Sequence, residues 1–403
     1  MIKKLTRIFA VLLAFILFSV TAFSAVEVRD KAFYEKYKDK NISINVHNWG
    51  EYICNDAENS INVNAEFEEL TGIKVNYTTF ASNEELYARL KSGGAQYDVV
   101  IPSDYMIAKF IREGMLEKLD KKNIPNVKYT NREFMGMKYD PNDEYSVPYT
   151  WGTVGIIYNK TMVDDDITSW SSLWDARYMG NMLMFSNPRD AFALAEKKLG
   201  YSLNTADMAQ LHRAADELKA QKPLVQAYVM DEIFDKMQGG EAALAPYYAG
   251  DALTMMADNE DLAFVVPQEG TNKFVDSICI PKGSKEKAAA ELYINFLCEP
   301  AVAAANIEYI GYSTPNTEAF KLLPQEVQES PISYPPAEVM QKAEFFYDLP
   351  IEVSREMDSL WVEVISADVG YSKWTIPVLM VLCIIAAVGI NVVRSVRKKR
   401  DIY

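Results

Sequence analysis

The sequence predicts an α/β protein whose strands form open sheets in two lobes. Strand-like and helix-like segments alternate between residues 42 and 114, which is typical of strands that pair in parallel. Similar elements return between residues 148 and 296, and no long low-complexity linker separates the two regions. Roughly 340 residues lie between the two chain ends, which is too many for one ordinary domain. Two lobes joined by strands is therefore the simplest interpretation.

The first region contains three predicted strands, each followed by a helix. Gly72 ends the first of these helices, and Ser82 with Glu85 forms a capping box at the start of the second. The elements in chain order are a polar leader at 27–40, a strand at 42–49, a helix at 57–71, a strand at 73–80, a helix from the Ser82 cap to 93–94, a strand at 97–102 and a helix at 104–114.

The second region has the same kinds of element. Its last strand is apolar almost throughout, as expected of a strand buried on both faces. The elements are a strand at 148–158, helices at 191–199, 207–221 and 230–237, a strand at 274–281 and a helix at 285–296.

The two ends of the chain indicate export and a membrane anchor. Residues 1–25 have a basic start, an apolar run and small residues, which predicts a secretory signal peptide cleaved after Ala22, Ser24 or Ala25. Residues 374–393 carry no charge and are long enough to span a bilayer as a helix. The basic tail at 394–403 stays on the cytoplasmic side. The region between the ends is therefore expected outside the cell membrane.

The charge of the chain becomes more negative when the two ends are set aside. The whole chain has 41 Lys+Arg and 56 Asp+Glu, a formal charge of −15. The ends hold eight of the basic residues and one of the acids, so the outer region carries −22. An acidic chain of this kind is a poor nucleic-acid binder and is better suited to cationic ligands.

Few residues support metal or hydrolytic chemistry. His47 and His212 are the only histidines, and no GxSxG or HExxH motif is present. The sequence therefore predicts that the protein is not an enzyme and has no cofactor. Cys54, Cys279 and Cys298 lie outside the predicted span, and Cys383 lies within it. Their spacing predicts buried free thiols and no disulfide framework.

Several polar and aromatic residues follow predicted strands, where ligands bind in open α/β sheets. Glu51 lies between two aromatic residues after the first strand, but a Glu in a loop is more often simply solvated. Asp276 lies within an apolar strand, so its carboxylate needs an internal partner or a cationic ligand. Asp251 faces a cleft or serves as a first-turn acid of a helix. Asn187, before Asp190, is expected to cap a helix.

With these residues in view, the chain resembles the spermidine/putrescine-binding proteins of bacterial polyamine transporters. The resemblance runs from about residue 42 to about residue 364. It is carried by NWGEY at 48–52, SNE at 82–84, DVVIPSDY at 98–105, YSVPYTWGTVGI at 145–156, TSWSSLW at 168–174, KKLGYS at 197–202, VDSICIP at 275–281 and IGYSTPN at 310–316.

The resemblance implies a two-lobe periplasmic-binding-protein fold of type II, with two strands that cross the hinge and a C-terminal transmembrane helix added. The crossings would fall near 149–156 and 274–280. Lobe one would hold 40–149 and 277–320, and lobe two would hold 150–276 and 321–364. The ligand would lie between the lobes, which close on it by a hinge motion.

The resemblance also implies which residues bind the ligand. Carboxylates would take the ammonium groups through charge-assisted hydrogen bonds, and aromatic rings would enclose the methylene chain. The implied walls are Trp49, Tyr248, Phe274 and Tyr312. The implied carboxylates are Glu51, Asp190, Asp251 and Asp276. Further contacts would come from Tyr52, Ser103 and Tyr105.

Some positions favour putrescine over spermidine. Asp251, three residues after Tyr248, and Phe274 resemble the putrescine-selective members of the family. Spermidine-selective members carry an acid where this chain has Asn187. Where the family has a Trp-Gln pair, this chain has two Phe residues, at 345 and 346. Tyr248 occupies a position where the family has Trp. Gly50 occupies a position where relatives often have Thr or Ser, so one possible hydroxyl contact is absent here.

The predicted function is capture of a polyamine outside the membrane by a monomer that delivers it to the permease subunits of an ABC transporter. Two alternatives stay open at this stage. One is a protein of the same fold that binds ferric iron or another cation, for which the adjacent Tyr247 and Tyr248 would be the candidates. The other is a membrane-tethered polyamine sensor, although the short tail carries no signalling domain.

Overall fold

The structure is a computed structural model that describes residues 26–55, 60–94 and 96–367. The predicted signal peptide at 1–25, the predicted span at 374–393 and the basic tail at 394–403 lie outside these ranges. Within the described ranges, every helix is too short or too polar to cross a membrane.

The described residues form one mixed sheet of nine strands in the order β2-β1-β3-β9-β4-β7-β5-β6, and β8 pairs with β4. The apolar residues of these strands build the core between the sheet and its helices. The strands are β1 (Ser43–Asn48), β2 (Lys74–Thr79), β3 (Val99–Val100), β4 (Ser146–Asn159), β5 (Met182–Phe185), β6 (Val225–Val229), β7 (Leu244–Tyr248), β8 (Leu262–Val265) and β9 (Lys273–Cys279).

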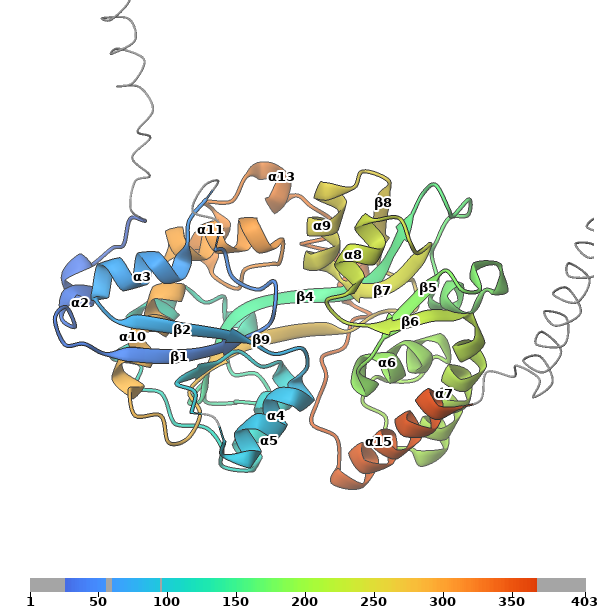
Figure 1. Cartoon of the computed structure of the whole chain (residues 1–403), viewed down its shortest axis with the longest axis horizontal. Helices are drawn as coiled ribbons and strands as arrows, with labels where there is room; N and C mark the ends of the chain where they lie inside the picture. The colour runs from blue at the N-terminus through green and yellow to red at the C-terminus, as the bar shows by residue number, and fades with distance from the viewer. Residues whose placement is uncertain (1–25, 56–59, 95, 368–403) are drawn as a thin grey trace, which may run out of the picture.

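Two long antiparallel strands join the halves of the sheet (Figure 1). β4 pairs with β9 over 146–153 and with β7 and β8 over 154–159. On one side β1 pairs in parallel with β2 and β3, and on the other β5 pairs in parallel with β6 and β7. We call these sides, with the helices that cover them, the β1 half and the β5 half.

Helices cover both halves (Figure 1). In the β1 half lie α3, α4, α5, α10 and α11, and in the β5 half lie α6 to α9 and α15. The helices are α2 (Lys31–Glu35), α3 (Val63–Thr71), α4 (Asn83–Ser92), α5 (Asp104–Arg112), α6 (Pro188–Lys198), α7 (Met208–Gln221), α8 (Ile233–Gln238), α9 (Ala249–Asp258), α10 (Lys287–Leu297), α11 (Pro300–Ile310), α12 (Thr317–Phe320), α13 (Gln325–Gln328), α14 (Ala337–Met340) and α15 (Ile351–Ser366).

Local capping determines where the first helices begin and end. The helix predicted at 57–71 begins only at Val63, because the Asn62 side chain accepts a hydrogen bond from the Ala65 N–H at 3.0 Å. It ends at Gly72, which adopts φ +72°. The predicted Ser82 cap is confirmed, since Ser82 Oγ accepts from the Glu85 N–H at 3.1 Å, while the Glu85 carboxylate accepts from the Ala81 N–H at 2.9 Å in place of the Ser82 N–H.

The polar leader expected at 27–40 packs against the rest of the fold. It contains α2, whose Tyr34 is fully buried and donates a hydrogen bond to Glu299 Oε1 at 2.8 Å. Buried Asn126 and Asn295 both donate to the same hydroxyl. One aromatic residue among charged neighbours can thus anchor a short helix when its hydroxyl finds partners.

Residues 321–350 pack against both halves. Tyr334 packs edge-on against Phe320 with ring centroids 4.9 Å apart, and Phe346 packs edge-on against Tyr105 at 5.9 Å. Asp348 then forms a salt bridge with Arg112 of α5 before the chain enters α15. The lobe boundaries taken from the resemblance stay a prediction.

The cysteine prediction is confirmed for the described residues. Cys54, Cys279 and Cys298 are buried and free. Burial raises the pKa of the Cys298 thiol to about 12, so this thiol is protonated and unreactive at neutral pH.

Candidate functional site

A cleft lies where the two halves of the sheet meet, with about 720 Å³ of empty space that includes a part open to solvent. Residues that follow all six parallel strands line it, because the carboxyl ends of these strands point to the same place. The segments after β1, β2 and β3 face those after β5, β6 and β7, while β9 forms the floor. A ligand held here would contact both halves at once.

Every site residue predicted from the sequence lines this cleft. The residues are Trp49, Glu51, Tyr52, Ser103, Tyr105, Asp190, Tyr248, Asp251, Phe274, Asp276 and Tyr312. They come from eight separate elements or loops, so the fold brings together residues more than 260 positions apart. Their role as ligand contacts stays a prediction, but their placement in one cavity is a finding.

Asp276 lies on the floor of the cleft with only 4% of its surface exposed. Its Oδ2 accepts a hydrogen bond of 2.6 Å from the Tyr52 hydroxyl, which also lies 2.6 Å from Thr150 Oγ1. Among the described residues, Oδ1 has no partner. Burial raises the Asp276 pKa to about 6, although the Tyr52 and Ser103 hydroxyls stabilise the charged form. A cation in the cleft would supply the missing partner.

Asp190 lies at one side of the cleft, in the first turn of α6. Its Oδ2 accepts a hydrogen bond of 2.8 Å from the Tyr248 hydroxyl. Asn187 caps α6 as expected, with Oδ1 accepting from the Asp190 N–H at 2.9 Å, and it also lines the cleft. Burial raises the pKa of Asp190, while the Tyr248 hydroxyl opposes the shift.

Asp251 and Glu51 lie at the other side. Both readings of Asp251 are correct, because it is a first-turn acid of α9 and also faces the cleft. It is 8% exposed, and burial raises its pKa well above the usual range. The charges of Asp231 and Glu51 add to this shift, and the Tyr312 hydroxyl opposes it. Glu51 itself is exposed at the edge of the cleft.

The predicted aromatic walls contact one another around the cavity. Tyr312 packs edge-on against Tyr52 with ring centroids 4.7 Å apart. Phe274 packs edge-on against Tyr248 at 5.5 Å and against Tyr312 at 6.2 Å. These rings expose apolar faces next to carboxylates, an arrangement that suits a cation attached to a hydrocarbon chain.

Sequence reasoning missed two carboxylates of the cleft. Asp231 follows β6, a short strand that was not predicted, and Glu84 follows the first residue of α4. The Tyr105 hydroxyl donates to Glu84 Oε1 at 3.1 Å. Prediction of β6 would have revealed Asp231 by the same strand-end rule that identified Glu51.

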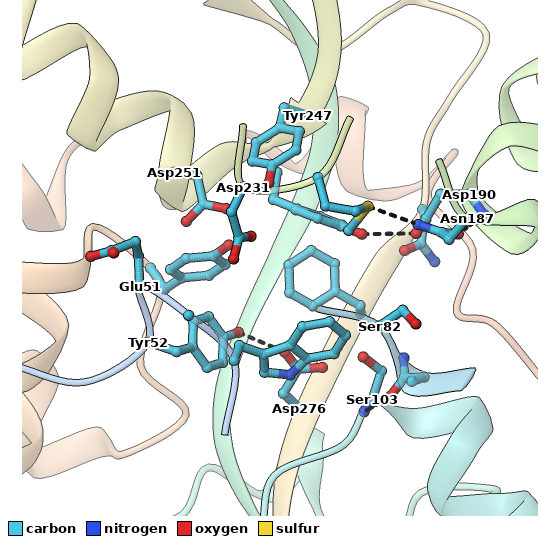
Figure 2. Close-up of a pocket in the computed structure, with 18 of the residues that line it drawn as sticks. Glu51, Tyr52, Ser82, Ser103, Asn187, Asp190, Asp231, Tyr247, Asp251 and Asp276 are labelled. Atoms are coloured by element: carbon cyan, nitrogen blue, oxygen red, sulfur yellow. Dashed lines mark hydrogen bonds between the residues drawn. The ribbon is translucent and has the colours of Figure 1, made fainter. Parts of the chain in front are cut away.

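The cleft is strongly acidic. Figure 2 shows Glu51, Asp231 and Asp251 together at one side, Asp190 at the other and Asp276 between them. Among the described residues that line it, none is Lys, Arg or His. The neighbouring Arg189 is turned away, with its guanidinium 4.3 Å from the Phe346 ring and bonded to Asn204 Oδ1. Nothing in the lining therefore neutralises these carboxylates.

The tyrosine pair considered for iron does not favour that chemistry. Burial raises the pKa of Tyr247 and of Tyr248, which disfavours the phenolates that bind ferric iron. The Tyr248 hydroxyl instead donates to Asp190. Within the described ranges, no group of three or more His, Cys, Asp or Glu side chains is arranged to hold a metal ion.

Two α/β halves around a cleft at their strand ends are the architecture found in solute-binding proteins. Residues 62–335 match the family model of bacterial extracellular solute-binding proteins. More narrowly, the chain belongs to the spermidine/putrescine-binding protein family, which confirms the resemblance and the expectation that it is not an enzyme.

Three relatives illustrate the match. The spermidine/putrescine-binding periplasmic protein of Escherichia coli is 38% identical over 316 residues, covering 78% of this chain and 89% of the relative. The putrescine-binding periplasmic protein SpuD of Pseudomonas aeruginosa is 31% identical over 344 residues, covering 80% and 92%. A solved structure from Listeria monocytogenes, described as a spermidine/putrescine ABC transporter, is 37% identical with a TM-score of 0.76, covering 81% and 99%. The α/β periplasmic-binding-protein fold is thus confirmed.

Proposed function

We propose that the protein captures a polyamine outside the cell membrane and delivers it to the permease subunits of an ABC transporter. The observation that carries this proposal is Asp276, a buried carboxylate with one unpartnered oxygen on the floor of an acidic, aromatic cleft. The relatives named for spermidine and putrescine support the same class of ligand.

Each part of a polyamine has a matching part of the cleft. Asp251 at one side would take one ammonium group of putrescine, and Asp276 on the floor, with Asp190 at the other side, would take the second. Such charge-assisted hydrogen bonds contribute about 1.5–3 kcal/mol each. Phe274, Tyr248 and Tyr312 would pack against the methylene groups and attract the cations through their ring faces.

We further propose that a short diamine such as putrescine binds more tightly than spermidine. Asn187 supports this preference because it supplies no carboxylate for a further ammonium group. Its Oδ1 accepts from the Asp190 N–H, and its Nδ2 donates to Met230 Sδ. Phe346 is 4% exposed and fills space beside the cleft, where a longer ligand would extend. A relative at 31% identity is named for putrescine.

The location follows from the predicted chain ends. We propose a monomer whose binding region lies on the extracytoplasmic face and whose predicted helix at 374–393 tethers it to the membrane. Tethering would keep the loaded protein close to the permease and raise its effective concentration there.

Calorimetry on residues 26–372 tests the proposal with putrescine, cadaverine, spermidine, spermine and ferric iron. We expect saturable heat with the polyamines and tightest binding with putrescine. Tight iron binding with no polyamine heat would overturn the proposed function. Spermidine binding about tenfold tighter than putrescine, or about 1.4 kcal/mol, would overturn the preference alone.

A further inference from the structure

Gly50 and Asp231 face each other across the cleft. Gly50 follows β1 in the β1 half, and Asp231 follows β6 in the β5 half. A Cβ atom added to Gly50 would lie 2.5 Å from Asp231 Oδ2, so the flexible Asp231 side chain would have to rotate away from its present position. The glycine is thus what leaves room for the Asp231 carboxylate in its present position.

The Asp231 carboxylate has no protein partner. Across the described ranges, neither a hydrogen bond nor a salt bridge reaches this side chain, which is exposed to solvent at the edge of the cleft. Figure 2 shows it beside Asp251, while the Glu51 carboxylate lies further out at the edge of the cleft and points away from the other two. The charges of Asp231 and Glu51 both raise the pKa of Asp251, which places the three carboxylates within electrostatic reach of one another. Without a cation, three acids from two halves of the molecule would repel.

A second observation indicates that this acidic group belongs to a ligand site. Asp276, next to it on the cleft floor, is more than nine-tenths buried and has an unpartnered Oδ1. A buried carboxylate oxygen without a donor is strongly unfavourable unless a ligand supplies one.

We propose that Asp231 is a specificity-determining carboxylate. Together with Glu51 and Asp251 it forms a binding site for one primary ammonium group, which we call the seat. Gly50 leaves the space that the Asp231 carboxylate occupies. This inference rests on the proposed polyamine function. A primary ammonium has three N–H donors, which match acceptors from three carboxylates. A secondary ammonium has only two donors and carries an extra carbon into the seat. The seat therefore selects the terminal amine of a diamine over an alkylated amine.

The test uses the full chain in mild detergent and calorimetry with two probes, putrescine and N,N′-dimethylputrescine, whose amines are secondary. Asp231→Asn keeps the shape of the side chain and removes its charge. We expect it to weaken putrescine binding at least about tenfold and to reduce the preference for putrescine over the dimethyl probe. Asp235→Asn, an exposed acid on α8 outside the cleft, is the matched control and should change neither.

A double-mutant cycle tests the role of Gly50. Gly50→Ala should weaken putrescine binding several-fold in the natural chain, because the added methyl group displaces the Asp231 carboxylate. In an Asp231→Ala background the same change should have less than about a twofold effect, since the displaced group is gone. Thermal unfolding of each variant checks that it is folded.

The outcomes separate the two proposals. If the natural chain binds no polyamine, the proposed function fails. If it binds putrescine but Asp231→Asn leaves both affinity and probe preference unchanged, the polyamine function stands and the Asp231 seat is overturned. If Gly50→Ala weakens binding equally in both backgrounds, Gly50 does not act through Asp231.

Discussion

At the scale of single residues, Asp276 combines three properties that rarely occur together. It is buried, it accepts one short hydrogen bond from Tyr52, and its second oxygen has no partner among the described residues. Such a group destabilises the ligand-free protein and stabilises the complex with a cation. Its contribution to binding should therefore be large.

Replacement of Asp276 by Asn should weaken putrescine binding at least thirtyfold. Asn can still accept from Tyr52, but it leaves an ammonium without its carboxylate, which costs about 2–5 kcal/mol. Titration calorimetry of both proteins measures the difference. An unchanged affinity would mean that Asp276 has only a structural role.

Binding should also depend on pH. The Asp276 pKa of about 6 predicts that putrescine affinity is constant well above pH 6 and falls as the carboxyl takes up a proton below it. Protonation of this group alone predicts a loss of about tenfold at pH 5. Calorimetry at several pH values measures the slope, and the Asp276→Asn variant should show a shallower one. Equal slopes would assign the titration to other groups.

The stability of the ligand-free protein should change in the opposite direction. Because the folded-state pKa of Asp276 is raised above the unfolded value, the native state binds this proton more tightly. The contribution is fully present below the unfolded pKa near 4 and is lost as pH rises through about 6. Thermal unfolding across pH 4–7 reports it, again with Asp276→Asn as the control.

At the scale of elements, the wall formed by Tyr312 depends on a close approach between α9 and the end of α11. Gly250 lies in the first turn of α9, and a Cβ added there would lie 2.2 Å from Tyr312 Cδ2. Gly311, which ends α11 with φ +75°, lies against the Gly250 carbonyl. Residues without side chains therefore let the two helices position Tyr312.

Gly250→Ala should displace the Tyr312 ring. We expect it to destabilise the protein by about 1–3 kcal/mol through overpacking and to weaken ligand binding as well. Gly94→Ala is a suitable control, since its nearest neighbour to an added Cβ is Ser92 Oγ at 3.6 Å. Chemical unfolding and calorimetry together measure both effects. Wild-type values in both assays would contradict the role assigned to this contact.

At the scale of the whole molecule, we expect the acidic cleft to link ligand binding to closure of the two halves. Glu51 belongs to the β1 half, while Asp231 and Asp251 belong to the β5 half. Repulsion between these charges favours separation of the halves, and a bound cation removes the repulsion. The strands β4 and β9 are placed to act as the hinge (Figure 1).

Putrescine should therefore make the protein more compact. Small-angle scattering is expected to show a smaller radius of gyration at saturating putrescine than without it. The Asp276→Asn variant at the same putrescine concentration should change less, because it binds less. No change in the natural protein, under conditions where calorimetry shows saturation, would contradict closure.

Much of this organisation could be predicted from the sequence because its signals are local. Hydrophobic alternation identified β1 and β2, and side-chain caps identified α4 and α6. The long strand β4 was predicted at 148–158 and extends over Ser146–Asn159. Asp276 was identified as a buried acid from its apolar neighbours alone, and the structure places it in the cleft.

Other features depend on residues distant in sequence, and local patterns could not reveal them. β5, β6 and β8 are only four or five residues long and are strands because they pair with neighbours in the sheet. A strand was expected at 97–102, but only Val99–Val100 form strand β3. Pairing with neighbouring strands again determines which residues belong to the strand. Pairing across a sheet is decided by tertiary contacts more than by propensity.

The sequence by itself determined the fold class, because alternating strand and helix patterns are local, and its resemblance to a known family implied eleven residues that line one cleft. Only the tertiary structure decided that Asp231 and Glu84 join them, that Tyr34 anchors the leader, and that Asp276 keeps one oxygen unpartnered. The physical reason is that burial, hydrogen bonding and electrostatic coupling are set by distances in space, which the chain establishes only when its two halves come together.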